Sequence, residues 1–323
     1  MEWHYQNDSV IFDFSQMYDF IGDTHGEAKL LKRLLLKLNY VETDGVYEHP
    51  KRKAVFLGDF INRGHKVKKT VGIIRSMVER GSGIAILGNH EINLILYYFA
   101  VVNKVATPID GNRLYSEYNV ERTLKEYKDD EPGLSELVRW LTTLPLFFEQ
   151  AGVRAVHACW RDKSVAYIRN LYPDFIIPEQ GYLELLHSTS KLSKHVSILT
   201  KGIAYKVPNR RLVKDRRGKA RRHFRMKWWL DNSKLTYAEM DFDSRLTVPD
   251  VKPKRITVPS EHYGKDEVPV FFGHYSRIDE QLILADNVCC LDAGVSKGGR
   301  LAAYRYHPKD KRLLKRRIVF VKR

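Results

Sequence analysis

Three polar clusters in the first third of the chain each follow a short apolar run, and this recurrence constrains the fold more than any other feature. The clusters are "GDTHG" at residues 22–26, "GDFINRG" at 58–64 and "GNHE" at 88–91. The runs "AVFL" and "GIAIL" before the second and third have the length and composition of buried strands. Their alternation with amphipathic segments predicts a sheet flanked by helices, and such sheets bind ligands at their strand ends.

The remaining elements are predicted from hydrophobic periodicity and turn residues. Leu30 to Leu38 and Val67 to Val78 have helical spacing, the second ending before Gly81, and a further helix is expected in "DDEPGLSELVRWLTTLP". We expect a loop at 42–50, an irregular stretch over 161–201, and a hairpin in "LFFEQAGVRAVHA". Short strands are predicted in "VPVFFGH", "NVCCLDAG", "RLAAYRY" and "RIVFVKR". Together these elements predict a sandwich of mixed sheets with helices outside.

The length of 323 residues favours one large domain. We expect a single domain over 1–323, with insertions at about 103–140, 161–201 and 207–266. The start "MEWHYQNDSV" has no leader pattern, and no run approaches the ~18 apolar residues of a membrane span, so we expect a soluble, cytoplasmic protein without a membrane partner. Cys159, Cys289 and Cys290 are too few for a disulfide framework, which predicts reduced, packed cysteines.

The formal net charge is +16, and a basic run at 210–227 carries much of it. This run, "RRLVKDRRGKARRHFRMK", holds ten Lys or Arg against one Asp, so it would attract an anionic partner. Two interpretations stay open: a solvated loop, or a lid in which Arg221, Arg222 and Arg225 bind substrate phosphate. The run also admits nucleic acid as a partner. Trp228 and Trp229 either stack on a base or anchor the loop to the core.

The polar clusters have the composition of a metal site. Asp23 and His25 are separated by one residue, so on an extended strand end their side chains point the same way and reach one ion. Further polar residues at predicted strand ends are Asp59, Asn89, His157 and His274. Carboxylate, imidazole and amide ligands without thiolate suit Mn²⁺, Fe or Zn²⁺. Two such ions sharing a carboxylate can clamp a phosphoryl group and activate a water.

Five segments, "GDTHG", "GDFINRG", "GNHE", "VHACW" and "FFGHYS", resemble in order and spacing the motifs of calcineurin-like metallophosphoesterases. The resemblance is to the branch that contains phosphoprotein phosphatases and symmetrical diadenosine tetraphosphatases. It implies an α/β fold, a four-layer αββα sandwich with two divalent metals, Mn²⁺ first among them. It implies that Asp23 and His25 hold one metal, that Asp59 bridges, and that Asn89, His157 and His274 hold the other. It also implies a phosphate-binding Arg63 and a general acid, His90.

The sequence departs from that pattern at two places. Asn62 stands where protein phosphatases of this branch carry an Asp that orients the catalytic His, so we expect differently tuned acid catalysis. Ser276 stands where many members of the wider family have a further His, which supports the phosphatase and tetraphosphatase branch. Lys297, in "LDAGVSKGG", is predicted as a turn residue that could neutralise a distal phosphate.

The sequence therefore predicts a hydrolase in which metal-bound hydroxide attacks a phosphate ester or phosphoanhydride directly. The motif set, Asn62 and the basic run favour nucleotide-type substrates such as dinucleoside polyphosphates, or nucleic-acid ends. A serine/threonine or tyrosine phosphoprotein phosphatase is the alternative. A third hypothesis is an inactive scaffold that binds nucleic acid through its positive charge, and the retained ligand positions argue against it.

Overall fold

Two five-stranded sheets form the centre of the computed structural model. It describes residues 16–104, 120–150, 152–187, 189–206, 213–215, 218, 220–221, 223–242, 246–248, 250–253, 262–278 and 281–323. The first sheet has the order β17-β16-β1-β4-β5. Its strands are β1 (Met17–Ile21), β4 (Arg52–Phe56), β5 (Gly83–Ala85), β16 (Arg300–Tyr306) and β17 (Ile318–Lys322). β1, β4 and β5 are parallel neighbours, so the polar clusters that follow them leave the sheet at one edge.

The second sheet has the order β14-β15-β13-β7-β6. Its strands are β6 (Phe147–Gln150), β7 (Val153–Val156), β13 (Val270–Phe272), β14 (Ile283–Ala285) and β15 (Val288–Cys290). β6 and β7 form the predicted hairpin, and β13 lies parallel to both β7 and β15. The segments after β7 and β13 therefore also leave this sheet at one edge.

The two sheets pack face to face, as the sandwich prediction requires. Successive residues of β1 belong to different hydrophobic clusters: Tyr18 and Phe20 face the second sheet, whereas Ile21 packs with the helices. The rings of Phe20 and Phe271 stack between the sheets with centroids 4.1 Å apart. This period of two is what a strand buried on both faces produces.

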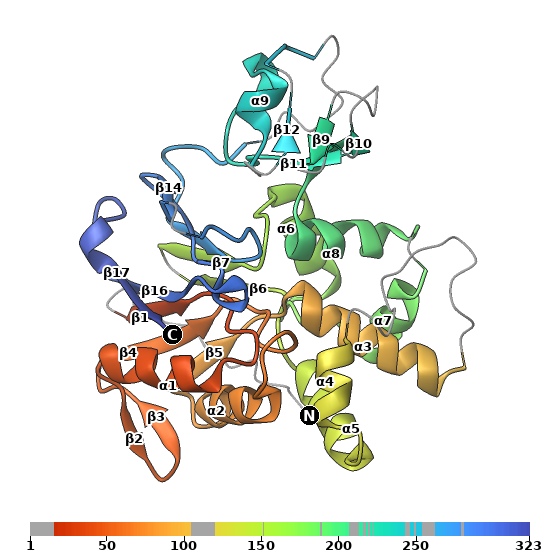
Figure 1. Ribbon diagram of the computed structural model, residues 1–323, viewed down its shortest axis with the longest axis vertical. Coiled ribbons are helices and arrows are strands. Elements are labelled where there is room, and N and C mark those ends of the chain that lie inside the picture. The colour runs from red at the N-terminus through yellow and green to blue at the C-terminus, as the bar shows by residue number, and fades with distance from the viewer. Residues whose placement is uncertain are drawn as a thin grey trace, which may run out of the picture.

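Helices cover the outer faces of the sandwich (Figure 1). α1 (Ala28–Lys37) and α2 (Val67–Glu79) bury leucine and isoleucine side chains against the first sheet, including Leu31, Leu34 and Ile74. The outer face of the second sheet packs with side chains of the segment 160–201, for example Phe147 against Trp160 at 5.4 Å between ring centroids. The predicted αββα layering is thus observed.

Two segments differ from the prediction. Residues 161–201, expected to be irregular, contain α6 (Asp162–Leu171), α7 (Glu179–Leu185) and α8 (Lys191–Lys201). Residues 42–50, expected to be a loop, contribute to a hairpin of β2 (Val41–Thr43) and β3 (Val46–Glu48). Asp44 and Gly45 have φ of 51° and 80°, the left-handed conformation of a two-residue hairpin turn, which Asp-Gly favours.

Between β5 and β6 the chain forms α3 (Asn89–Val102), α4 (Glu121–Glu126) and α5 (Glu131–Leu141), the last of them the helix predicted there. The described parts of 204–247 form β8 (Ala204–Lys206), β9 (Val213–Asp215), β10 (Ala220–Arg221), β11 (His223–Arg225), α9 (Tyr237–Met240) and β12 (Leu246–Thr247). Their small core includes Tyr205 and Phe224, and Figure 1 shows these elements grouped at one end of the molecule.

Several side chains whose role the sequence analysis left undecided are buried. Trp228 and Trp229 are 3% and 6% exposed and pack against Phe272, so they anchor the basic segment to the second sheet. The three cysteines are free and buried, as predicted. None of the helices in the described ranges has the length and hydropathy needed to span a bilayer.

Candidate metal centre

The predicted ligands meet at the strand ends of the two sheets. Asp23 and His25 follow β1, Asp59 follows β4, and Asn89 begins α3 just beyond β5. From the second sheet, His157 follows β7 and His274 follows β13. Backbone hydrogen bonds join these turns: His25 N donates to Asp59 O at 3.0 Å, and Gly273 N donates to His157 O at 2.8 Å. The loops are therefore fixed against one another.

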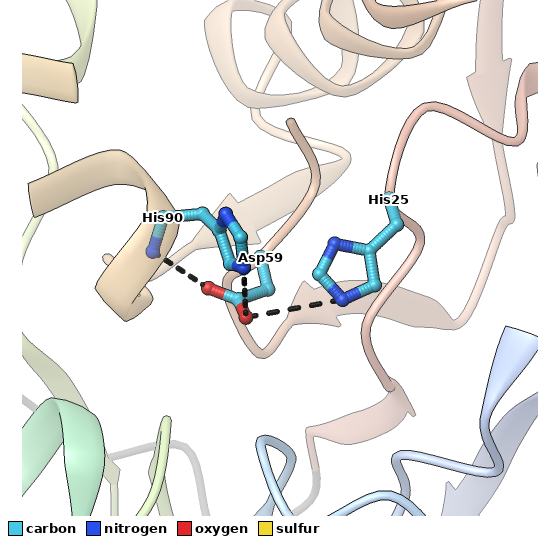
Figure 2. Close-up of side chains that lie close together, drawn as sticks. All are labelled: His25, Asp59 and His90. Carbon is cyan, nitrogen blue, oxygen red and sulfur yellow. Dashed lines mark hydrogen bonds and ion pairs between the residues drawn. The ribbon is translucent and has the colours of Figure 1, made fainter. Parts of the chain in front are cut away.

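The Asp59 carboxylate lies between two groups of ligand atoms. On one side, His25 Nε2 is 3.9 Å from Asp59 Oδ2 (Figure 2). The same nitrogen is 3.8 Å from Asp23 Oδ2. On the other, His157 Nε2 is 3.3 Å from both Asp59 Oδ1 and Asn89 Oδ1, and His274 Nδ1 is 2.7 Å from Asn89 Oδ1. These separations leave each group of atoms close enough to share one ion.

The orientation of two imidazole rings fits metal coordination. His157 Nδ1 lies 2.7 Å from Leu57 O, and His25 Nδ1 lies 3.2 Å from Ile61 O. A carbonyl only accepts, so in each ring Nδ1 carries a proton, and Nε2, which faces the cluster, is the nitrogen that would bind a metal. Metal-binding histidines commonly have such an outer partner, which fixes both ring and tautomer.

The electrostatics of the cluster also favour a cation. Burial and the neighbouring Asp292 raise the pKa of Asp23 well above its usual range. Burial opposes ionisation of Asp59, yet His157 and His90 hold the pKa of Asp59 well below its usual range. Burial lowers the pKa of His157, but Asp59, together with Asp23 and the Leu57 carbonyl, raises that pKa to about 10. Without a cation, Asp59 thus stabilises a proton on His157, where a metal would supply the positive charge instead.

The other two histidine ligands favour the neutral form. Burial lowers the pKa of His25 to about 3, although Asp59 opposes this shift. Burial, with help from the Arg225 charge, holds the pKa of His274 well below its usual range. A neutral imidazole is the form that binds a metal, so neither ring must lose a proton first.

Backbone strain is concentrated at this site. Nine described residues other than glycine have positive φ, and five of them are His25, Asp59, Asn62, Arg63 and His274. Such conformations cost about 1–3 kcal/mol each, and surrounding contacts must compensate. Glycine is required where the carboxylates pack on the backbone: a Cβ at Gly88 would lie 2.3 Å from Asp59 Oδ1, and one at Gly273 would lie 2.0 Å from Asp23 Oδ1.

Glu91, to which the sequence analysis gave no role, joins the second and third polar clusters. Its Oε2 accepts from the N–H groups of Asp59 and Gly88, at 2.7 and 2.9 Å. Its Oε1 accepts from those of Phe60 and Ile61, at 3.0 and 3.2 Å. Glu91 is fully buried. One carboxylate therefore holds the loop that carries Asp59 against the start of α3.

We expect Glu91→Gln to destabilise the protein by roughly 2 to 6 kcal/mol. The amide group would face two buried N–H donors, and each lost acceptor costs about 1–3 kcal/mol. Burial, with Asp59, raises the pKa of Glu91 to about 7, so the comparison by urea unfolding belongs at pH 8, where the wild-type carboxylate is ionised. Glu184→Gln, at an exposed position of α7, is the matched control. Equal unfolding free energies for the two variants would contradict this role of Glu91.

The structure separates the predicted substrate-binding residues. Arg63 is exposed at the end of the second cluster, with Nη1 3.2 Å from Ser296 Oγ. Arg225 is half-buried on β11, its guanidinium 5.5 Å from the Tyr275 ring centroid. Lys297 is exposed in the short 3₁₀ turn Val295–Lys297, whereas Arg221 is exposed on β10. Arg222 lies outside the described residues. Arg225 and Lys297 act electrostatically on the cluster, through His274 and Asp292 respectively.

Comparison with known proteins identifies the family of this chain. The profile of the family described as "Calcineurin-like phosphoesterase" matches residues 18–237, more than half of the chain. The chain therefore belongs to the calcineurin-like phosphoesterase family.

Among curated relatives, the asymmetrical bis(5'-nucleosyl)-tetraphosphatase PrpE of Oceanobacillus iheyensis is 32% identical over 34% of this chain and 40% of its own length. The symmetrical bis(5'-nucleosyl)-tetraphosphatase of Buchnera aphidicola subsp. Baizongia pistaciae is 24% identical over 90% of this chain and 95% of its own. A protein serine/threonine phosphatase from Saccharomyces cerevisiae superposes with a TM-score of 0.49 at 14% identity, over 98% of this chain and 81% of its own. The chain thus spans less than half the length of the PrpE relative.

Proposed function

We propose that this protein is a metal-dependent phosphoesterase that cleaves nucleotide-type substrates at a phosphoester or phosphoanhydride bond. The main support for this proposal is that six buried or half-buried ligand groups from five strand ends converge, with Asp59 between the other five. Their oxygen and nitrogen donors suit a divalent ion of the Mn²⁺, Fe or Zn²⁺ type, and we propose Mn²⁺. When bound, two such ions would neutralise phosphoryl charge and lower the pKa of a water.

Each ligand has a proposed place. Asp23 and His25 would hold one ion, Asn89, His157 and His274 would hold the other, and Asp59 would be shared by both. His90, whose Nε2 is 3.8 Å from Asp59 Oδ2, would face the leaving oxygen of the substrate. Asn62 holds the other side of the His90 ring, with Nδ2 3.0 Å from Nδ1.

Basic side chains around the cluster would bind the phosphates. Arg63 lies near Ser296, the neighbour of Lys297 in the sequence, and the charge of Arg225 acts on His274. Lys201, which the sequence analysis did not single out, adds a positive charge that helps to lower the pKa of His90. Burial, opposed by Asp59, lowers the pKa of Lys201 to about 8. Several cations around one anionic centre favour a substrate with more than one phosphate.

The substrate class is supported by relatives rather than by the site alone. Two of the proteins similar to this chain are named bis(5'-nucleosyl)-tetraphosphatases, one of them aligned over 90% of this chain. The high positive charge suits polyphosphates as well as nucleic-acid ends. We therefore place dinucleoside polyphosphates first among substrates.

Metal removal tests the proposed activity directly. We expect turnover of an aryl phosphate to disappear in chelator and to return with Mn²⁺, and the apparent melting temperature to rise with the metal. A ligand present at one hundred times its Kd adds about 2.7 kcal/mol to the free energy of unfolding.

A panel of dinucleoside polyphosphates, mononucleotides, oligonucleotide ends and phosphopeptides would then rank the substrates. No metal-dependent turnover on any of them would refute the phosphoesterase; fastest turnover of phosphopeptides would refute the substrate class.

We expect Arg225→Gln to raise KM for a dinucleoside polyphosphate roughly tenfold, because a charge-assisted hydrogen bond contributes about 1.5–3 kcal/mol. The effect should be smaller on a small aryl phosphate. Lys206→Gln is the control, since Lys206 is exposed on β8, the partner strand of β11, and its loss removes the same charge. Steady-state kinetics on both substrates measure the difference. An equal KM change in both variants would assign the effect to overall charge and not to Arg225.

A further inference from the structure

The side chain of Asn62 lies between His90 and a short helix, α4, that the function proposed above does not use. Asn62 Oδ1 is 3.1 Å from Thr123 N and 2.6 Å from Thr123 Oγ1. At its other end, Asn62 Nδ2 is 3.0 Å from His90 Nδ1. All three side chains are buried, at 3%, 0% and 9% exposure for Asn62, Thr123 and His90. A chain of hydrogen bonds therefore runs from α4 to the imidazole.

The direction of this chain follows from its donors. A backbone N–H can only donate, and the N–H of Thr123 faces one end of the Asn62 amide, so that end must be the oxygen. The same N–H also donates to Val120 O at 3.0 Å. The opposite end of Asn62 is then the NH₂ group, which can only donate. His90 Nδ1 must accept that hydrogen, so the neutral ring carries its proton on Nε2. A carboxylate at position 62 would impose the reverse, because it would accept a proton from Nδ1.

This tautomer also decides whether His90 is a ligand. Nε2 of His90 lies near Asp59 and His25, and ligand atoms of the three residues are within 4.8 Å of one another (Figure 2). Coordination through Nε2 would require the ring proton on Nδ1, where it would meet the Asn62 NH₂ group. Two donors facing each other at 3.0 Å are unfavourable, so His90 presents Nε2–H to the centre as a hydrogen-bond donor.

α4 (Glu121–Glu126) is fixed to the loop that carries Asn62. Arg122 Nε donates to Gly64 O at 3.0 Å. The Glu126 carboxylate accepts from Val67 N at 2.9 Å and from Lys68 N at 3.0 Å, at the first turn of α2. Thr123 lies between these two contacts, on the side that meets Asn62. The helix is thus held on both sides of Thr123, which restricts where its hydroxyl group can point.

We propose that Thr123 is a positioning residue that holds the Asn62 amide with its NH₂ group toward His90 and so fixes His90 as the neutral Nε2–H tautomer. The consequence for turnover rests on the proposed phosphoesterase function, whereas the tautomer itself does not. A neutral ring that donates from Nε2 would stabilise charge on a leaving oxygen by a hydrogen bond. A protein phosphatase-like Asp at this position would instead hold the ring through Nδ1–H.

The test is ¹⁵N NMR of the full chain labelled at histidine, loaded with diamagnetic Zn²⁺ and without substrate. Long-range ¹H–¹⁵N correlations distinguish protonated from unprotonated ring nitrogens, and the His90 signals are assigned by their loss in His90→Gln. We expect the proton on Nε2 in the wild type and in Thr123→Ser. We expect it on Nδ1 in Asn62→Asp. Thr123→Val loses the hydroxyl hydrogen bond to Asn62 Oδ1 and keeps only the backbone N–H, which Val120 O also uses, so there we expect a mixture of tautomers. A wild-type His90 protonated on Nδ1 would overturn the proposal.

Kinetics give the second readout. Thr123→Val should lower kcat about 2- to 10-fold, in proportion to the fraction of the Nε2–H tautomer that is lost, with KM little changed, and Thr123→Ser should restore most of it. If Thr123→Val keeps both the wild-type tautomer and the wild-type kcat, Thr123 is not a positioning residue. If no variant, including the wild type, hydrolyses any phosphate while the tautomers are as expected, the proposed function fails and this proposal stands.

Discussion

Asp59→Asn should lower turnover more than about 100-fold and reduce bound metal below two ions per chain. Its two oxygens face different ligand groups: Oδ1 is 3.3 Å from His157 Nε2, and Oδ2 is 3.9 Å from His25 Nε2. The amide can still accept from His90 N, as Asp59 Oδ1 does at 2.9 Å, so the loop should keep its shape. The variant loses the negative charge that both ions would share. Changing even an outer partner of a metal ligand lowers metal affinity or activity by about 10–100-fold, so loss of a shared ligand should have a larger effect.

Elemental analysis after dialysis, together with kcat on an aryl phosphate, measures both effects. Asp23→Asn is the informative comparison, because Asp23 Oδ2 lies 3.8 Å from His25 Nε2 on one side of the cluster, whereas Asp59 also lies 3.3 Å from His157 Nε2 on the other. It should lose less metal than Asp59→Asn. Asp129→Asn, at an exposed position beside α5, controls for the change of charge. Two tightly bound ions in Asp59→Asn would show that Asp59 does not bridge.

The cluster of proposed ligands was predictable because each of them lies within four residues of the end of a strand. "GDTHG" and "GDFINRG" are visible as polar interruptions of apolar runs, and parallel pairing of β1 with β4 brings such interruptions to one edge. The roles assigned to these residues stay predictions, since the structure gives distances and not a bound ion. The placement of all six proposed ligands in one cluster is what the sequence could indicate.

The residues that organise the centre from outside were harder to predict. Thr123 meets Asn62 across 61 positions of sequence, from a helix of six residues with no strong apolar period. Glu91 stands inside a recognised motif, yet its four N–H donors become apparent only when the two loops are packed together. Such contacts depend on tertiary geometry, which local spacing does not encode.

Two elements that were predicted wrongly have clear signals in the sequence. Asp44-Gly45 is the dipeptide most typical of a two-residue hairpin, so the β2–β3 pair could have been predicted. In α8, Leu192, Val196 and Leu199 follow one face at helical spacing and are buried. The Thr236 capping box at α9 is a similar local signal inside a segment that was assigned only as an insertion.

His90→Ala should keep its metal content and lose about 10²- to 10³-fold in kcat on substrates with poor leaving groups. His90 Nε2 lies 3.8 Å from Asp59 Oδ2, whereas Asn62 occupies Nδ1, so the side chain adds a donor to the centre without being needed to hold an ion. Removing one preorganised donor to developing negative charge has an effect of this size. The loss should shrink on an activated aryl phosphate, whose leaving oxygen needs little stabilisation.

The comparison therefore requires two substrates and one metal assay. kcat is measured on a dinucleoside polyphosphate or alkyl phosphate and on a nitrophenyl ester, and bound metal is measured on the same preparation. His262→Ala, at an exposed histidine, is the control and should match the wild type in all three values. Equal losses of kcat on both substrates would indicate that His90 acts in substrate binding or folding and not on the leaving oxygen. Loss of a bound ion would indicate that His90 is a metal ligand. The second outcome would also require Asn62 to turn its oxygen toward His90, against the N–H of Thr123 at 3.1 Å.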